Sequence, residues 1–166
     1  MRGWADLKIS LFCTQDNGGA GKAALRLNKG LNQIGEDSTL FVKWKASGND
    51  KVIQLNSPEI NNRVFERVIR KNFFTNILLG NTIASAMYPS IGSNVLEQLR
   101  EFDVVNLHWI PTLISLETIA KIHQMRKPIV WTLHDQNPMT GACHYAHGCE
   151  KYKSDCSECP QLKNNP

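Results

Sequence analysis

The sequence predicts an α/β fold, a Rossmann-like parallel sheet flanked by helices with a cysteine-rich loop segment at its C-terminal end. Two observations carry this prediction. An apolar strand, a glycine turn, an amphipathic helix and a second strand follow one another between residues 7 and 43. The same alternation of strand and helix returns between residues 103 and 133. Strands that alternate with helices form parallel sheets with right-handed crossovers.

The first strand-helix-strand unit is built around a glycine turn. Residues 7–13 form a short apolar run, and Asp16-Asn17-Gly18-Gly19 follows as a tight turn. Residues 20–34 predict an amphipathic helix that Gly35 can end, and residues 38–43 predict the second strand. The stripe of this helix expected to face the core consists of Ala20, Ala24, Leu27, Leu31 and Ile34.

The middle of the chain is less regular. Residues 44–56 are polar, with a short strand at 52–55, and Ser57-Pro58 is typical of a helix start, so a helix is expected to about Phe73. Residues 75–93 predict a short helix and a loop. One face of the longer helix carries Arg63, Arg67 and Arg70. Such a helix either packs on the core with a solvated cationic face or rests on an anionic membrane surface as a peripheral contact.

A second unit follows from residue 103. Residues 103–107 predict a strand that ends in His108-Trp109, Ser115 caps a helix through about Met125, and residues 129–133 predict a strand that ends in His134-Asp135. In open parallel sheets, ligands bind outside the carboxyl ends of the strands. The glycine turn, His108-Trp109 and His134-Asp135 are therefore expected at one edge of the sheet.

Length and charge narrow the function classes. The chain has 166 residues, 42% of them apolar, which is enough for one compact domain. We expect residues 1–140 to form the Rossmann-like part and residues 141–166 a cysteine-rich extension of it.

The charged residues that give the net charge of +4 are scattered along the chain, so no nucleic-acid partner is predicted. No apolar run is long enough to cross a bilayer and the start does not resemble a signal peptide, which favours the cytoplasm, with contact at the inner face of the membrane left open.

The glycine turn suits an anionic ligand. Gly18, Gly19 and Ala20 let the backbone approach closely and present helix N–H groups, a seat for a diphosphate or carboxylate, although a turn needed only for its geometry is the alternative. The spacing is not Gly-x-Gly-x-x-Gly, and Lys43 stands where a dinucleotide site needs an acidic residue. A P-loop is also excluded, because its spacing is absent.

Two histidines are candidates for chemistry. His134 ends an apolar strand, and a neutral imidazole there could donate to a sugar hydroxyl or stabilise charge near a reacting centre. The alternative is an ordinary hydrogen-bonding residue. His108-Trp109 combines a polar tip with a broad ring suited to a sugar face, and the alternative for Trp109 is core packing.

Four cysteines crowd near the C-terminal end of the chain. Cys143, Cys149, Cys156 and Cys159 lie within 17 residues, and the last two have the Cys-x2-Cys knuckle spacing. This pattern suits a structural zinc site, which would be closed and leave no position for a substrate water. Reduced thiols and disulfides remain the other two states. Cys13, in an apolar run, is expected to be a small buried hydrophobic residue.

Four stretches taken together resemble the N-terminal domain of bacterial family 4 (group 1) glycosyltransferases, especially those that build exopolysaccharide and surface sugars. The most specific are the Leu-His-Trp-Ile strand end and the Thr-Leu-His-Asp stretch that runs into the cysteines. The four stretches span residues 18–27, 103–110, 130–135 and 140–162.

The resemblance implies half of a two-domain GT-B enzyme of the hexosyltransferase type. Such enzymes transfer a sugar from a nucleotide-sugar co-substrate to a glycan or lipid-linked acceptor, retain anomeric configuration and use no catalytic metal. By resemblance, the turn at Gly18, Gly19 and Ala20 contacts the donor diphosphate and His134 is catalytic. His108, Trp109 and Asp135 line the acceptor side.

The resemblance also implies that the C-terminal donor domain is not part of this chain. The chain alone is then expected to lack activity and to need that domain in cis or in trans. A reading from a different class is a small zinc-stabilised protein-interaction module with a vestigial sugar-transferase fold.

Overall fold

The computed structural model describes residues 7–56, 64, 67–68, 83–89, 91–157 and 159. The chain forms two compact units. The first unit joins Met1–Ile60 to Met87–His134, and the second joins Asn61–Ala86 to Asp135–Pro166. The expectation that residues 1–140 form the Rossmann-like part and residues 141–166 a cysteine-rich extension of it stays a prediction.

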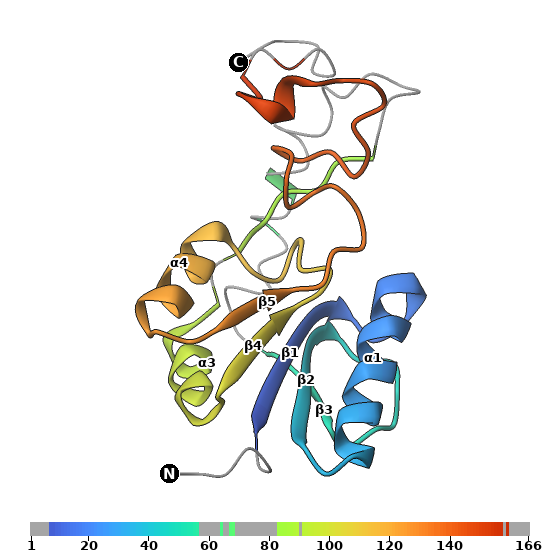
Figure 1. Cartoon of the computed structure of the whole chain (residues 1–166), viewed down its shortest axis with the longest axis vertical. Coiled ribbons are helices and arrows are strands. Elements are labelled where there is room, and N and C mark those ends of the chain that lie inside the picture. The colour runs from blue at the N-terminus through green and yellow to red at the C-terminus, as the bar shows by residue number, and fades with distance from the viewer. Residues whose placement is uncertain are drawn as a thin grey trace. The chain divides into compact units, whose positions relative to one another are not determined.

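The first unit is a five-stranded, wholly parallel sheet, which confirms the predicted α/β class (Figure 1). Its strand order is β3-β2-β1-β4-β5. Every predicted strand is present within about two residues of its expected bounds. The strands are β1 (Lys8–Gln15), β2 (Asp37–Trp44), β3 (Val52–Gln54), β4 (Val104–Leu107) and β5 (Ile129–Trp131).

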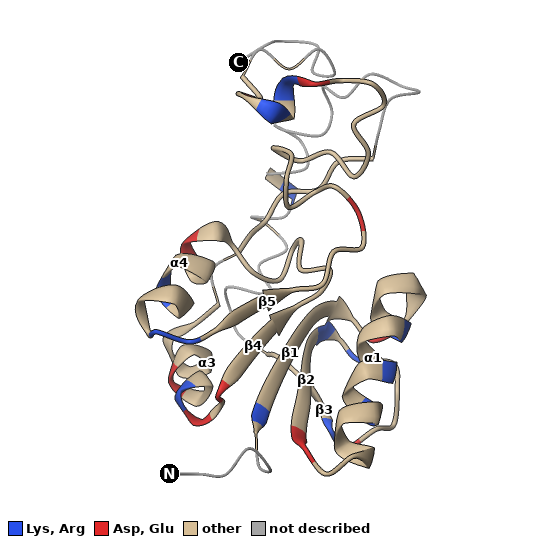
Figure 2. Ribbon diagram, viewed as in Figure 1, with Lys and Arg blue, Asp and Glu red and all other residues tan. Residues whose placement is uncertain are grey.

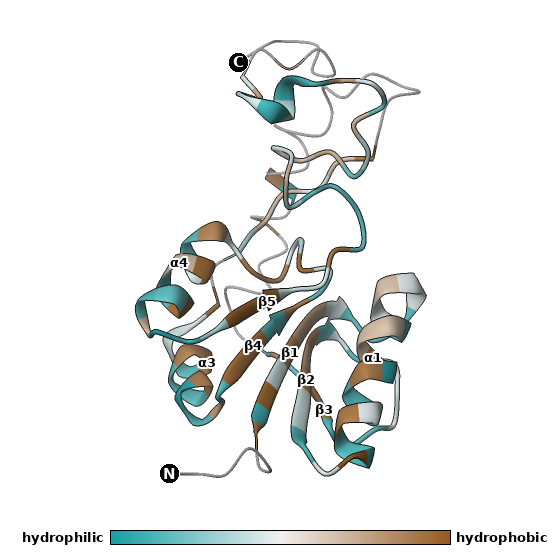
Figure 3. Ribbon diagram, in the orientation of Figure 1, coloured by the Kyte–Doolittle hydropathy of each residue, from teal (hydrophilic) through white to brown (hydrophobic). Residues whose placement is uncertain are grey.

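Helices cover both faces of this sheet. One face packs against helix α1 (Gly18–Gln33) in a buried cluster that we call the α1-side core. Its buried members are Leu11 and Cys13 of β1, Leu40 and Val42 of β2, Val52 of β3 and Ala24 of α1. On the other face, Phe12 stacks on Phe41 at 5.1 Å in a second core. The two sets alternate along β1 and β2, as a period of two residues requires. Brown segments, which mark hydrophobic residues, correspondingly lie along the strands in Figure 3.

Three helical segments cover the second core. They are α3 (Ser93–Gln98), the 3-10 turn η2 (Leu99–Glu101) and α4 (Leu116–Gln124). The helix α4 begins as predicted, because the Ser115 hydroxyl accepts a hydrogen bond from the Thr118 N–H at 3.2 Å. The sequence analysis missed α3 and η2. Their signal was the spacing of Val95 and Leu99, both of which are buried in this core.

The buried stripe of α1 differs from the predicted one. Leu27 is 37% exposed and Ile34 is 76% exposed, so their assignment to the core was wrong. The buried positions are Gly21, Ala24 and Asn28. The stripe is rotated because Gly21 lets the helix approach the end of β1, where an added Cβ would lie 2.5 Å from the Gln15 carbonyl oxygen.

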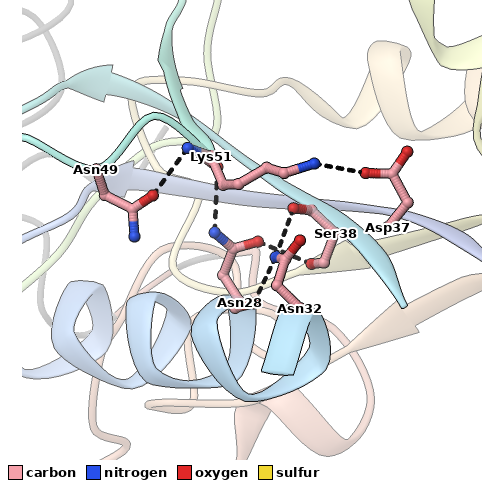
Figure 4. Close-up of polar contacts among 6 residues, drawn as sticks. All are labelled: Asn28, Asn32, Asp37, Ser38, Asn49 and Lys51. Atoms are coloured by element: carbon pink, nitrogen blue, oxygen red, sulfur yellow. Dashed lines mark hydrogen bonds and ion pairs between the residues drawn. The ribbon is translucent and has the colours of Figure 1, made fainter. Parts of the chain in front are cut away.

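A polar cluster ties α1 to the start of β2 and to the residue before β3 (Figure 4). The fully buried Asn28 donates from its amide to the Lys51 carbonyl at 3.1 Å and accepts from the Ser38 hydroxyl at 2.8 Å. Asn32 donates to the Ser38 carbonyl, also at 2.8 Å. Because these bonds satisfy groups that water cannot reach, a polar residue occupies a position that periodicity would assign to an apolar one.

The helix predicted from residue 57 to about residue 73 lies mostly outside the described residues, as does most of the stretch 75–93. Of the helix, Val64, Arg67 and Val68 are described; all three are helical and exposed. No helix in the described part of the chain is long and apolar enough to cross a membrane. Charges of both signs are spread over the first unit (Figure 2). On α4, Lys121 pairs with Glu117 at 2.6 Å.

The close approach of α1 to β1 makes a stability prediction. Gly21→Ala should lower the free energy of unfolding by about 1–3 kcal/mol, because the new methyl group meets backbone atoms that cannot yield. Gly30→Ala is the matched control, since a Cβ there meets nothing within 4 Å, and it should raise stability by about 0.5–1 kcal/mol. Urea denaturation measures both, and equal effects would contradict the packing described.

The polar cluster around Asn28 leads to a second stability prediction. Asn28→Ala should cost about 1–3 kcal/mol, because the Lys51 carbonyl and the Ser38 hydroxyl lose buried partners. Asn49→Ala removes one exposed hydrogen bond to the Lys51 N–H and should cost under about 1 kcal/mol. The difference between the two unfolding free energies tests whether burial decides the cost.

Candidate functional site

The candidate site lies where the strand order of the sheet reverses. From β1 the chain crosses to β2 and β3 on one side, and later to β4 and β5 on the other. The polar segments after β1, β4 and β5 therefore share one edge, as the sequence predicted for the glycine turn, His108-Trp109 and His134. Beyond the strands, the pairing continues: the His108 N–H donates to Phe12 at 2.9 Å and the Thr14 N–H donates to Trp109 at 2.8 Å. Ligands bind at such switch points in open parallel sheets.

The glycine turn after β1 presents the start of α1 to solvent. Gly18 has φ +70°, a conformation that favours glycine, and both Gly18 and Gly19 are exposed. The Asn17 side chain makes no capping bond, and the first turn holds no acidic residue. The first N–H groups of this 16-residue helix thus face a region that could accept an anionic group.

Asp16 is a residue whose part in the site the sequence analysis did not specify. It is buried, and its carboxylate accepts hydrogen bonds from the Ala46 N–H at 2.7 Å and the Ser47 N–H at 2.9 Å. Burial raises the pKa of this carboxyl, but the neighbouring Ser47 hydroxyl and the two N–H groups outweigh it, so the pKa of Asp16 is lowered. Asp16 therefore holds the loop after β2 next to the glycine turn. The signal was an aspartate placed directly before an Asn-Gly turn.

Lys43 brings a positive charge close to the end of β2, the neighbour of β1. The side chain is only 3% exposed. Its Nζ donates to the Thr112 carbonyl at 3.2 Å and lies 4.9 Å from the centre of the Trp44 ring. The sequence argument used Lys43 only to exclude a dinucleotide site, although a lysine near the end of a buried strand is itself an unusual placement.

His108 and His134 form a hydrogen-bonded pair. His108 Nδ1 lies 2.9 Å from His134 Nε2, and the two rings stack with centres 5.2 Å apart. Trp131 Nε1 donates to the His108 carbonyl at 3.2 Å, which fixes the backbone of the pair against β5. His108 is 3% exposed, whereas His134 is partly exposed. A ligand at this edge would therefore meet His134 first.

Burial keeps the inner ring of the pair neutral. Desolvation, and then repulsion from His134, lower the pKa of His108 to about 4. His108 Nε2 is buried without a hydrogen-bond partner among the described residues. An unpaired buried acceptor is more common than an unpaired buried N–H, which favours the His108 tautomer that carries its proton on Nδ1. That proton is then donated to His134 Nε2.

Two other predicted acceptor residues have different surroundings. Trp109 is partly exposed and packs against the α1-side core, in line with the packing alternative. Asp135 belongs to the second unit, where its carboxylate accepts from the Asn137 N–H at 2.9 Å and lies 3.3 Å from His144 Nδ1. The assignment of Trp109 and Asp135 to acceptor binding stays a prediction.

The four clustered cysteines line one cavity in the second unit. Burial, and then the three neighbouring cysteines, raise the pKa of the Cys143 thiol. None of the five cysteines, all of which lie in the described part of the chain, forms a disulfide, and Cys13 is fully buried in the α1-side core, as predicted. Among the described residues, no group of three or more His, Cys, Asp or Glu side chains is placed so that it could hold a metal ion as the structure stands.

The neutral inner histidine makes a pH prediction. Because the pKa of His108 is below its ordinary value of 6.5, the unfolded chain takes up the proton first. Stability should then fall as pH decreases from about 6.5 to about 4, by on the order of 3 kcal/mol from this residue, with no further loss from it below. NMR titration of the ring should show His108 uncharged at pH 6. In His134→Ala its pKa should rise yet stay below 6.5. A His108 that titrates near 6.5 in the parent chain would contradict the burial.

The sequence is similar to a protein of Escherichia coli (strain K12) that is provisionally named colanic acid biosynthesis glycosyl transferase WcaC, with 28% identity over 156 residues. No family model and no solved structure matches the chain. The aligned part covers 90% of this chain but 38% of that curated relative, so this chain spans less than half of the relative's length. Over nearly its whole length, the chain is thus similar to one part of a bacterial glycosyltransferase.

Proposed function

We propose that this chain is the acceptor-side, N-terminal half of a retaining glycosyltransferase of the GT-B type. The complete enzyme would move a sugar from a nucleotide-sugar donor to a glycan or lipid-linked acceptor. The observation that carries the proposal is the pairing of His134 with the buried His108 on the same sheet edge as the exposed glycine turn. The similarity to a glycosyltransferase over 90% of the chain agrees with this reading.

Each part of the edge has a chemical task in this proposal. The N–H groups at Gly18, Gly19 and Ala20 bind the donor diphosphate, whose charge they neutralise in part. His134 hydrogen-bonds the transferred sugar and stabilises charge that develops as the bond to the diphosphate breaks. A second lobe holds the rest of the donor, so the reaction takes place between the two halves and needs no catalytic metal.

His108 is assigned a positioning task instead of the acceptor contact that the resemblance implied. A side chain that is 3% exposed reaches little beyond its own neighbours. Its hydrogen bond and stacking hold the His134 ring at one angle and one tautomer. Within the first unit, the acceptor is then left to the partly exposed Trp109.

The proposal is tested by joining the chain to a donor-binding half. We would fuse the full chain to the part of the E. coli relative outside the aligned segment and measure release of nucleoside diphosphate from a panel of nucleotide sugars. The fusion should turn over at least one donor, and His134→Ala should reduce kcat by about 10²–10³-fold, the usual cost of a lost transition-state hydrogen bond. His123→Ala, on α4, is the matched control and should leave the rate unchanged.

Two outcomes would count against the proposal. A fusion that binds a nucleotide sugar in calorimetry but never releases the nucleotide would contradict the half-enzyme reading and favour a protein-interaction module. Turnover that is unchanged in His134→Ala would remove the role given to that residue.

His108→Phe should lower kcat with little change in KM and shift the pH profile, as expected for a positioning residue.

The glycine turn gives a separate test of donor binding. A Cβ at Gly19 meets nothing within 4 Å, so Gly19→Ala should leave the fold stable. The added methyl group would nevertheless stand between the helix N–H groups and a diphosphate. The KM for the nucleotide sugar should therefore rise about 10-fold or more, since about 1.4 kcal/mol of binding corresponds to a factor of ten. Gly30→Ala, at the far end of α1, should leave KM unchanged.

A further inference from the structure

The second unit has little in its described residues to hold it together. Its described regular structure consists of the 3-10 turn η3 (Lys151–Lys153), an isolated bridge between Ala84 and Cys143, and the helical positions Val64, Arg67 and Val68. Asn137 is the one buried residue in the described part of this unit, and no apolar side chain there is buried. Small segments without an apolar core are usually stabilised by disulfides or by a structural metal.

The cysteines of this unit converge on one place. Cys143, Cys149, Cys156 and Cys159 all line the same cavity, whose wall is almost entirely apolar. The two cysteine-bearing stretches run close together there, since a Cβ on Gly141 would lie 3.3 Å from the Cys156 Cβ. Four residues spread over 17 positions therefore line a single cavity.

The two histidines in the same stretch are occupied elsewhere. His144 Nε2 lies 2.9 Å from the Ser85 hydroxyl and its Nδ1 lies 3.3 Å from Asp135. His147 contacts the Tyr145 ring edge-on and does not line the cavity. The ligand set that the cavity offers therefore consists of the four cysteines.

We infer that the four cysteines bind one Zn²⁺ as a tetrahedral, closed structural site that holds the second unit together. Zinc prefers four thiolates at such spacings, and Cys156-x2-Cys159 supplies the knuckle pair. The four cysteines line one cavity but are not placed to hold a metal ion as the structure stands, so the inference requires that binding draws the sulfurs inward. Four thiolates around Zn²⁺ leave a net charge of about −2, which Lys151 in the cavity wall offsets in part. The inference is independent of sugar transfer.

The experiment is metal analysis of the full chain, purified without chelators. We expect about one zinc ion per chain by inductively coupled plasma mass spectrometry. Cys149→Ser or Cys159→Ser should lower zinc retention by more than about 10-fold, because even outer-shell changes cost that much. Cys13→Ala and His147→Asn are controls and should retain the metal; asparagine tolerates the positive φ of 47° at position 147.

A second measurement needs no variant to fold. In the native chain the four thiols should resist alkylation until a chelator is added, and peptide mass spectrometry should identify them as Cys143, Cys149, Cys156 and Cys159. Thiols that all react without a chelator would overturn the inference in favour of reduced cysteines. Thiols that react only after reduction would overturn it in favour of disulfides, and zinc retained by both serine variants would overturn the ligand set.

Discussion

The reversal of strand order between β1 and β4 is the constraint on which the rest of the site depends. Because all strands are parallel, every carboxyl end emerges at one edge, and the reversal there separates the loops that follow β1 and β4. The hydrogen bonds from His108 to Phe12 and from Thr14 to Trp109 extend the pairing past the regular strands. A change that loosened this pair of strands would displace the glycine turn and the histidines together.

The same edge shows how packing restricts chemistry. Each functional group is held by a buried neighbour: His134 by His108, the loop at Ala46 by the Asp16 carboxylate, and the start of α1 by the close contact at Gly21. A buried neighbour loses little entropy when a ligand arrives, because it is already fixed. In the proposed function the exposed groups that meet a ligand are therefore few, namely the glycine turn and His134.

The two units follow different physical strategies. The first unit buries two apolar clusters on opposite faces of a sheet, and its polar exceptions, such as Asn28, are fully hydrogen-bonded. The described residues of the second unit bury no apolar side chain, and they bring four cysteines to one cavity instead. A metal cross-link supplies in such a segment the constraint that a hydrophobic core supplies in a larger one.

The sequence by itself determined the class of the fold, the strands and the edge that would carry the site, because periods of two and 3.6 residues and turn residues are local signals. Only the tertiary structure decided which face of α1 is buried, since Gly21 and Asn28 depend on the distance to β1 and β2. It also decided that His108 lies behind His134, because residues 26 positions apart meet only when β4 pairs with β5. Burial is a property of neighbours, which no stretch of sequence contains alone.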